Sequence, residues 1–115
     1  MSEGLITVAE TPVFLRQAKE VWSDSEREDF ILYIAGNPEA GDVIPETGGI
    51  RKVRWSRAGT GKRGGVRVIY FFHDRSKPLY LLMVYAKGRR DNLDADDKKA
   101  LRGLADAIKG KRREA

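Results

Sequence analysis

Three strand-like segments decide the fold: IRKVRWS (Ile50–Ser56), GVRVIYFFH (Gly65–His73) and LYLLMVYAK (Leu79–Lys87). They are rich in Val, Ile, Tyr, Phe and Trp, the residues that favour pleated, half-buried strands. The segments between them, Ala58–Gly64 and Asp74–Pro78, contain turn residues and are short enough for hairpins. The sequence therefore predicts an antiparallel meander. The second and third strands are apolar at nearly every position, which is typical of inner strands with both faces partly covered.

Helical patterns flank the meander on both sides. Thr11-Pro12 predicts the start of a first helix, because Thr caps free amides and Pro fits the first helical position. A second helix follows Ser23-x-x-Glu26 or Ser25-x-x-Glu28, which both fit a capping box, and ends near Gly36. Apolar residues at helical spacing predict a last helix over Asp94–Ile108.

The whole chain of 115 residues is long enough for one domain. Residues 5–10 favour a short first strand, and residues 37–49 favour a loop. We predict a single α+β domain over residues 1–109, with element order β-α-α-β-β-β-α, in which a helical hairpin and a C-terminal helix pack on a small antiparallel sheet. Residues 110–115 are expected to form a basic tail.

Composition excludes several classes of protein. With no cysteine, the chain has no disulfide framework, thiolate metal site or catalytic thiol. Its apolar stretches are far shorter than the ~20 residues of a membrane helix, and residues 1–10 lack a basic signal-peptide region. We expect a cytoplasmic protein without a metal or other cofactor.

Charge is distributed unevenly along the chain. Residues 48–90 hold 12 Lys or Arg and one acid, Asp74, for a net charge of +11, whereas residues 1–47 carry −7 and residues 91–115 carry +1, which together give +5. Strands usually intersperse both signs of charge to avoid self-repulsion. The cationic block, residues 48–90, therefore indicates an anionic partner.

Strand alternation sorts these cations by face. Lys52 and Arg54 share one face of their strand, and Arg67 leads the next strand in phase with Ile69 and Phe71. The third strand is expected to place Leu79, Leu81, Met83, Tyr85 and Lys87 on a common face. We predict that Lys52, Arg54, Arg67, Tyr85 and Lys87 converge on one patch that suits an RNA backbone. For Tyr85, the pattern supports a packing role and a functional role equally.

Other motifs are better explained by structure. The loop Gly59–Gly65 lacks the spacing and the following helix of a phosphate-binding loop. His73 is the sole histidine, which excludes a paired-histidine mechanism within one chain and a histidine metal cluster. The aspartates at 94, 96 and 97 suit a helix start rather than calcium, and Trp22 and Trp55 are expected to pack.

The order and spacing of GIRKVRW (Gly49–Trp55), the glycine-rich loop, VRVIY (Val66–Tyr70) and the third strand segment resemble the RelE/HigB superfamily of bacterial toxins. The resemblance is greatest to HigB-type toxins and their phage-derived relatives. It implies a RelE-like fold and a toxin that cuts messenger RNA on the ribosome and is neutralised by an antitoxin, expected to be a helix-turn-helix protein from the adjacent gene.

The resemblance also implies site residues. The family's catalytic cations fall on Lys52, Arg54, Arg67 and Lys87, with Arg89 nearby, and Tyr85 is a further catalytic candidate. The other cations expected to contact RNA are Arg51, Arg57, Lys62, Arg63 and Arg90. Some members use a Tyr of the C-terminal segment as the base, but residues 86–115 contain no Tyr.

The implied reaction is attack of a ribose 2′-oxygen on the adjacent phosphorus, which leaves a 2′,3′-cyclic phosphate and releases the 5′-oxygen. Arg67 is expected to hold transition-state charge, since its fork can bind two phosphate oxygens. Lys52, Lys87 or Tyr85 can take the 2′-proton only where neighbouring cations favour the deprotonated form. The base therefore stays open. A non-catalytic nucleic-acid-binding module and a domain that binds an acidic protein are the alternatives.

Overall fold

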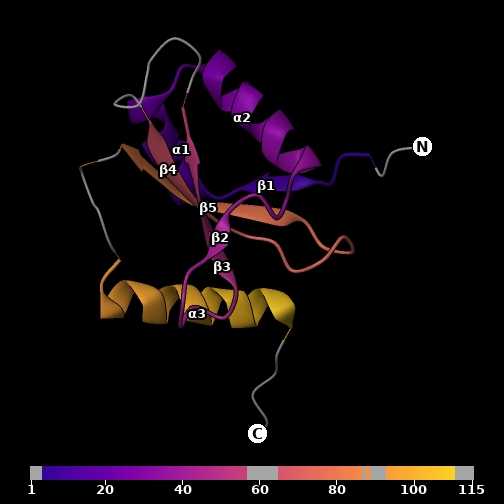
Figure 1. Cartoon of the computed structure of the whole chain (residues 1–115), viewed down its shortest axis with the longest axis vertical. Coiled ribbons are helices and arrows are strands. Elements are labelled where there is room, and N and C mark those ends of the chain that lie inside the picture. The colour runs from indigo at the N-terminus through magenta and orange to yellow at the C-terminus, as the bar shows by residue number, and fades with distance from the viewer. Residues whose placement is uncertain (1–3, 57–64, 87, 89–92, 111–115) are drawn as a thin grey trace, which may run out of the picture.

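A five-stranded mixed sheet forms the centre of the fold in the computed structural model, which describes residues 4–56, 65–86, 88 and 93–110 (Figure 1). The strand order is β1-β5-β4-β3-β2. The strands are β1 (Val8–Glu10), β2 (Asp42–Val43), β3 (Ile50–Trp55), β4 (Val66–Phe71) and β5 (Leu79–Ala86). The predicted α+β class is confirmed, and β3, β4 and β5 form the predicted antiparallel meander with β4 and β5 inside the sheet.

The sheet differs from the prediction at its two edges. β1 pairs with β5 in parallel, so the sheet is mixed rather than antiparallel. The Thr11 hydroxyl fixes this pairing, because it donates to the Leu81 carbonyl oxygen at 2.8 Å. β2 lies in the segment 37–49 that was predicted as a loop, and it pairs with β3. Gly41 permits this approach, since a Cβ there would lie 2.8 Å from the Lys52 carbonyl oxygen.

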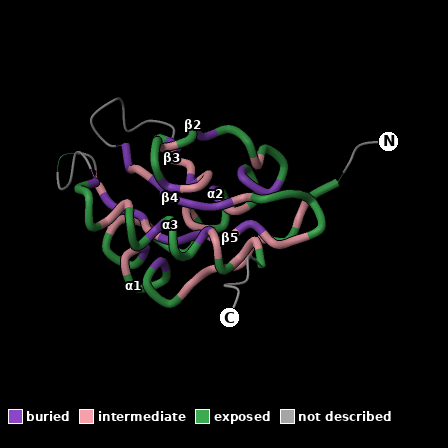
Figure 2. Tube along the Cα trace, turned by 90° about the horizontal axis from the view of Figure 1, so that it is seen from below, coloured by how far each residue is buried: buried purple, intermediate pink, exposed green. Residues whose placement is uncertain are grey.

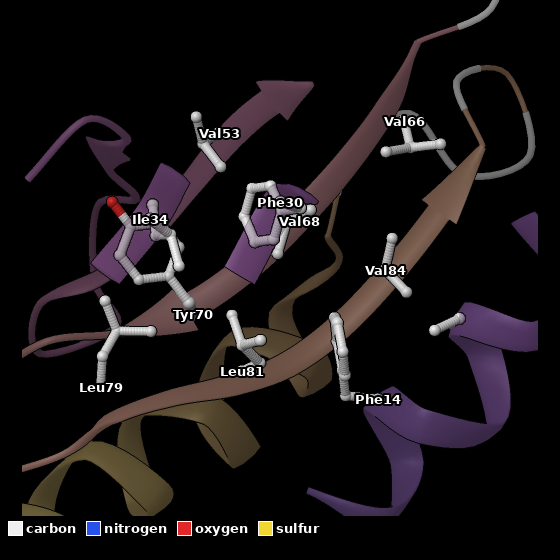
Figure 3. Close-up of a cluster of buried hydrophobic side chains, with 11 residues drawn as sticks. Phe14, Phe30, Ile34, Val53, Val66, Val68, Tyr70, Leu79, Leu81 and Val84 are labelled. Atoms are coloured by element: carbon white, nitrogen blue, oxygen red, sulfur yellow. The ribbon is translucent and has the colours of Figure 1, made fainter. Parts of the chain in front are cut away.

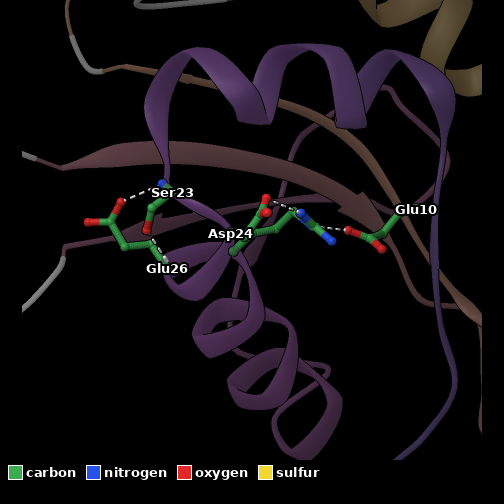
Figure 4. A network of polar contacts seen from close by, with 5 residues as sticks. Glu10, Ser23, Asp24 and Glu26 are labelled. Carbon is green, nitrogen blue, oxygen red and sulfur yellow. Dashed lines mark hydrogen bonds and ion pairs between the residues drawn. The ribbon is translucent and has the colours of Figure 1, made fainter.

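The three helices begin at the predicted caps. Thr11 caps α1 (Pro12–Val21), and Ser23 with Glu26 forms the capping box of α2 (Asp24–Gly36), as Figure 4 shows. Asp94 and Asp97 form a second box at the start of α3 (Ala95–Lys109), and Gly110, with a φ of 80°, ends this helix. None of the helices in the described part of the chain could span a membrane.

Separate cores lie on the two faces of the sheet. The hairpin of α1 and α2 covers one face, where Phe14, Phe30 and Ile34 pack onto the strands (Figure 3). The α3 helix covers the opposite face with Leu101 and Ala105. Burial is greatest along β4 and β5, which lie between the two cores (Figure 2). This double coverage explains why the sequences of the inner strands are almost continuously apolar.

A β-bulge separates the two halves of β5. Ile69 pairs with Met83 but Tyr70 pairs with Leu81, so Leu82 is an extra residue on β5. The prediction that Leu79, Leu81, Met83 and Tyr85 share a face is therefore wrong. Leu79 and Leu81 belong to the hairpin-side core, whereas Met83 and Tyr85 pack on the α3 side. One extra residue reverses the face of every later side chain.

Tyr70 ties the β2 segment to the middle of the sheet. Its side chain is 0% exposed, and its hydroxyl donates to the Pro38 carbonyl oxygen at 2.9 Å and accepts from the Gly41 amide at 2.8 Å. Burial raises the pKa of the Tyr70 phenol, so the hydroxyl keeps its proton and the donated hydrogen bond. This one hydroxyl satisfies two backbone groups of the loop between α2 and β2.

We expect Tyr70→Phe to lower the free energy of unfolding by about 1–3 kcal/mol, because two backbone groups lose their partner while the apolar packing stays. Chemical denaturation of the variant and of the wild type measures the difference. Tyr33→Phe is the control, since Tyr33 is 36% exposed. Equal losses in the two variants would contradict the role of the Tyr70 hydroxyl.

Candidate nucleic-acid interface

A row of three candidate site residues crosses the inner strands on the α3 side of the sheet. Arg54 of β3 pairs with Arg67 of β4, and Arg67 pairs in turn with Tyr85 of β5. Directly opposite residues have Cβ atoms about 4.5–5.5 Å apart and point to the same face. The structure therefore brings together Arg54, Arg67 and Tyr85, as predicted. The bulge before Met83 is what places Tyr85 on this face.

Two arginines directly opposite each other repel. Within residues 4–56, 65–86, 88 and 93–110, neither Arg54 nor Arg67 takes part in an ion pair. Asp74, the one acid of residues 48–90, belongs to the turn between β4 and β5. Hydrogen bonds from the Ser76 hydroxyl and amide lower the pKa of Asp74 and hold its carboxylate there.

The Arg67 guanidinium has an unusual environment. Its Nη1 atom is buried, and it has no hydrogen-bond partner in the part of the chain that the structure describes. A buried guanidinium nitrogen without an acceptor costs free energy, which an anion at this position recovers. Arg67 is therefore a candidate for binding an oxyanion.

A second row adds another cation from α3. In this row Lys52 of β3 pairs with Ile69 of β4, and Ile69 pairs with Met83 of β5. The row lies on the same face of the sheet as Arg54, Arg67 and Tyr85, two residues along β3 from Arg54. Lys52 and Lys98 line a pocket of ≈ 280 Å³ with Leu93 and the β2 segment. Lys98 is not among the site residues predicted from the sequence. Its spacing of three residues from Leu101 was the signal, because that spacing places both on the sheet-facing side of α3.

A further pocket lies beside Tyr85. It has a volume of ≈ 280 Å³ and is lined by Gln17, Glu20, Val21 and residues 83–86. The Gln17 side-chain oxygen accepts from the Val84 amide at 3.0 Å, which fixes α1 against β5. Glu20 is thus a carboxylate at the edge of the site that the sequence analysis did not identify, since α1 gave no signal of facing β5.

Not all predicted site residues join the cluster of Lys52, Arg54, Arg67 and Tyr85. Arg51 belongs to the hairpin side, and its guanidinium donates to the Gly41 carbonyl oxygen at 2.6 Å. Its contact with RNA stays a prediction. The remaining predicted residues, together with the basic tail 111–115, lie outside the described residues: Arg57, Lys62, Arg63, Lys87, Arg89 and Arg90.

The two tryptophans pack as predicted. Trp22 stacks on Phe30 with ring centroids 5.4 Å apart, and Trp55 meets the same ring edge-on at 5.4 Å. Both tryptophans thus pack against the hairpin-side core, away from Arg67. His73 follows β4, and its Nε2 atom lies 3.7 Å from a carboxylate oxygen of Asp74.

These features define a class of protein. A helical hairpin on one face of a mixed sheet, a C-terminal helix on the other and a row of cations across the inner strands are consistent with the fold of RelE-type toxins. The family described as RelE toxin of RelE / RelB toxin-antitoxin system matches residues 9–115, and the chain belongs to this family. It is therefore a toxin of a toxin–antitoxin system with an antitoxin partner. The HigB-type branch stays a prediction.

We expect Arg67→Met to leave the melting temperature unchanged or slightly raised, because the variant keeps the aliphatic stem and removes a cation from a self-repelling pair. Thermal unfolding at low and at high salt tests this. Any rise in the melting temperature should be larger at low salt, because salt screens the repulsion between the two arginines.

Arg51→Met is the matched control on the neighbouring strand. It removes hydrogen bonds to two backbone carbonyls, and should lower the free energy of unfolding by about 1–3 kcal/mol. A loss of this size in Arg67→Met would show that Arg67 is a structural residue.

Proposed function

We propose that the protein is a ribosome-dependent endoribonuclease that cuts messenger RNA and so inhibits translation. The observation that carries the proposal is the buried Nη1 atom of Arg67, which lacks a hydrogen-bond partner among the described residues and lies in register between Arg54 and Tyr85. Family membership supports it, because RelE family toxins are ribonucleases.

The two arginines bind the scissile phosphate. A planar guanidinium presents paired N–H donors that match two phosphate oxygens, and Arg67 and Arg54 come from adjacent strands to the same face. As the 2′-oxygen bonds to phosphorus, negative charge grows on the non-bridging oxygens. Fixed donors at this position stabilise the transition state without having to reorganise.

Proton transfer falls to residues around this pair. An arginine stays protonated, so the proton of the 2′-hydroxyl passes to another group as the 2′-oxygen attacks. Tyr85, opposite Arg67, and Lys52, one step along the sheet, are the candidates of the described cluster. Lys87, which follows β5, is a third candidate. A second proton goes to the departing 5′-oxygen, and the reaction needs no metal or other cofactor.

The ribosome supplies what this small site lacks. The cleavage geometry requires the 2′-oxygen, the phosphorus and the 5′-oxygen in line, and holding reactants in such a geometry contributes much of a rate enhancement. A ribosome that grips the messenger at the codon provides this alignment. The proposed place of action is therefore the translating ribosome in the cytoplasm, where the antitoxin neutralises the toxin.

We expect Arg67→Met to reduce the rate of messenger RNA cleavage on programmed ribosomes by roughly a hundredfold, because one preorganised donor to the transition state is lost. Arg16→Met is the control, since Arg16 is an exposed residue of α1 on the other side of the sheet. The assay follows single-turnover cleavage with saturating ribosomes.

The same assay separates catalysis from binding. Wild-type cleavage by the Arg67→Met variant would contradict the assignment. A wild-type protein that binds programmed ribosomes but leaves the messenger intact, at confirmed soluble expression, would instead identify a non-catalytic nucleic-acid-binding module.

Binding to ribosomes should weaken steeply with salt. Each phosphate neutralised by the cationic cluster releases counterions, so the affinity should fall by about tenfold or more between 50 and 200 mM salt. The measurement is a titration of catalytically inactive toxin against ribosomes at several salt concentrations. Replacing Arg54 should reduce the slope, and a flat response in the wild type would remove the electrostatic basis of the proposal.

A further inference from the structure

An apolar groove lies on the hairpin side of the protein, between the N-terminal segment and α2. It has a volume of ≈ 400 Å³, and its walls are Leu5, Ile6 and Val8 on one side and residues of α2 on the other. The α2 wall consists of Glu28, Ile31, Leu32 and Ala35. Leu5 is 62% exposed and Leu32 is 60% exposed, more than the other large apolar side chains of the described residues.

Polar contacts hold the walls of the groove in place at both ends. At one end the Arg27 guanidinium of α2 binds the Glu10 carboxylate of β1, with Nε and Oε2 2.8 Å apart (Figure 4). At the other end the Ile6 amide donates to the Ala35 carbonyl oxygen at 3.2 Å. Between these contacts the two walls leave the leucines exposed. The groove is therefore preformed, and a partner need not pay to open it.

The α2 wall of the groove is acidic. The helix contains Asp24, Glu26, Glu28 and Asp29 against a single cation, Arg27, which is already paired with Glu10 and Asp24. Glu28 lines the groove one turn before Leu32. Among the described residues, Glu28 forms no ion pair. A partner that fills the groove therefore has apolar side chains for the leucines and a Lys or Arg for Glu28.

We propose that this groove is the docking site of the antitoxin, which inserts an amphipathic segment with an apolar stripe and a basic flank. The proposal rests on the toxin–antitoxin assignment and adds the contact surface. Charge complementarity favours this occupant over RNA, whose phosphates the acidic wall repels. It also disfavours a second copy of the chain, because two such grooves facing each other would oppose their acidic helices.

The groove is separate from the cation row. Val8 pairs with the first residue of β5, whereas Tyr85 lies six residues further along this strand and on the opposite face. Six residues of strand span about 20 Å. An antitoxin anchored in the groove thus leaves Arg54 and Arg67 uncovered by the anchor itself. Variants of the groove should therefore affect antitoxin binding without affecting RNA cleavage.

The test measures the dissociation constant of purified toxin variants for the antitoxin encoded by the adjacent gene. Leu32→Gln should weaken binding by about tenfold, because a buried apolar contact is lost. Leu104→Gln is its matched control, an exposed leucine of α3 that is 46% exposed. Glu28→Lys should weaken binding by a similar factor, and Asp29→Lys controls for the same change of net charge on the same helix.

Growth arrest without antitoxin is the second measurement, and the groove variants should retain it. The docking site would be overturned if Leu32→Gln bound the antitoxin as tightly as Leu104→Gln does, and Glu28→Lys as tightly as Asp29→Lys does. The docking site would also be overturned if the wild-type toxin sedimented as a dimer and the Leu32→Gln variant sedimented as a monomer. If the groove binds antitoxin but the toxin leaves messenger RNA intact, the proposed activity fails and the docking site stands.

Discussion

The pairing of β4 with β5 determines which side chains can meet elsewhere in the protein. Strand alternation lets β5 contribute to both cores, and the register shift at Ile69 and Tyr70 moves Met83 from the hairpin face, which Leu81 occupies, to the α3 face. The same shift brings Tyr85 to the face of Arg67. A strand without the extra residue would bury Tyr85 under the hairpin and separate it from the arginines. The bulge thus links the packing of the fold to the composition of the site.

Most elements of the fold were predictable from local signals, because caps and strand patterns act over a few residues. The Ser23 and Asp94 caps and the three meander strands are examples. The bulge, the parallel pairing of β1 and the short strand β2 were not predictable, since each depends on contacts between distant segments. The patch containing Arg54, Arg67 and Tyr85 was predicted correctly, although the alternation assumed for β5 was wrong. Glu20 was missed because its position depends on how α1 docks against β5, whereas the spacing of Lys98 from Leu101 was a local signal.

The uneven charge of the sequence becomes a division between two surfaces. Lys52, Arg54 and Arg67 lie on the α3 side, and the acids of α2 lie on the hairpin side with the groove. Each surface therefore attracts a partner that the other repels. On the two proposals made above, this division would let the anionic messenger bind one surface and a basic antitoxin segment bind the other without competition.

The parallel pairing of β1 with β5 has a consequence for the order in which the chain is completed during synthesis. Val8 finds its partner only when Leu79 has been made, and the α1–β5 contact likewise requires a strand that ends at residue 86. Pairings so distant in sequence form late, because the intervening chain must close first. The nascent N-terminal half therefore leaves the exit tunnel without its sheet, and the arginine row has no Tyr85 beside it until β5 has been synthesised.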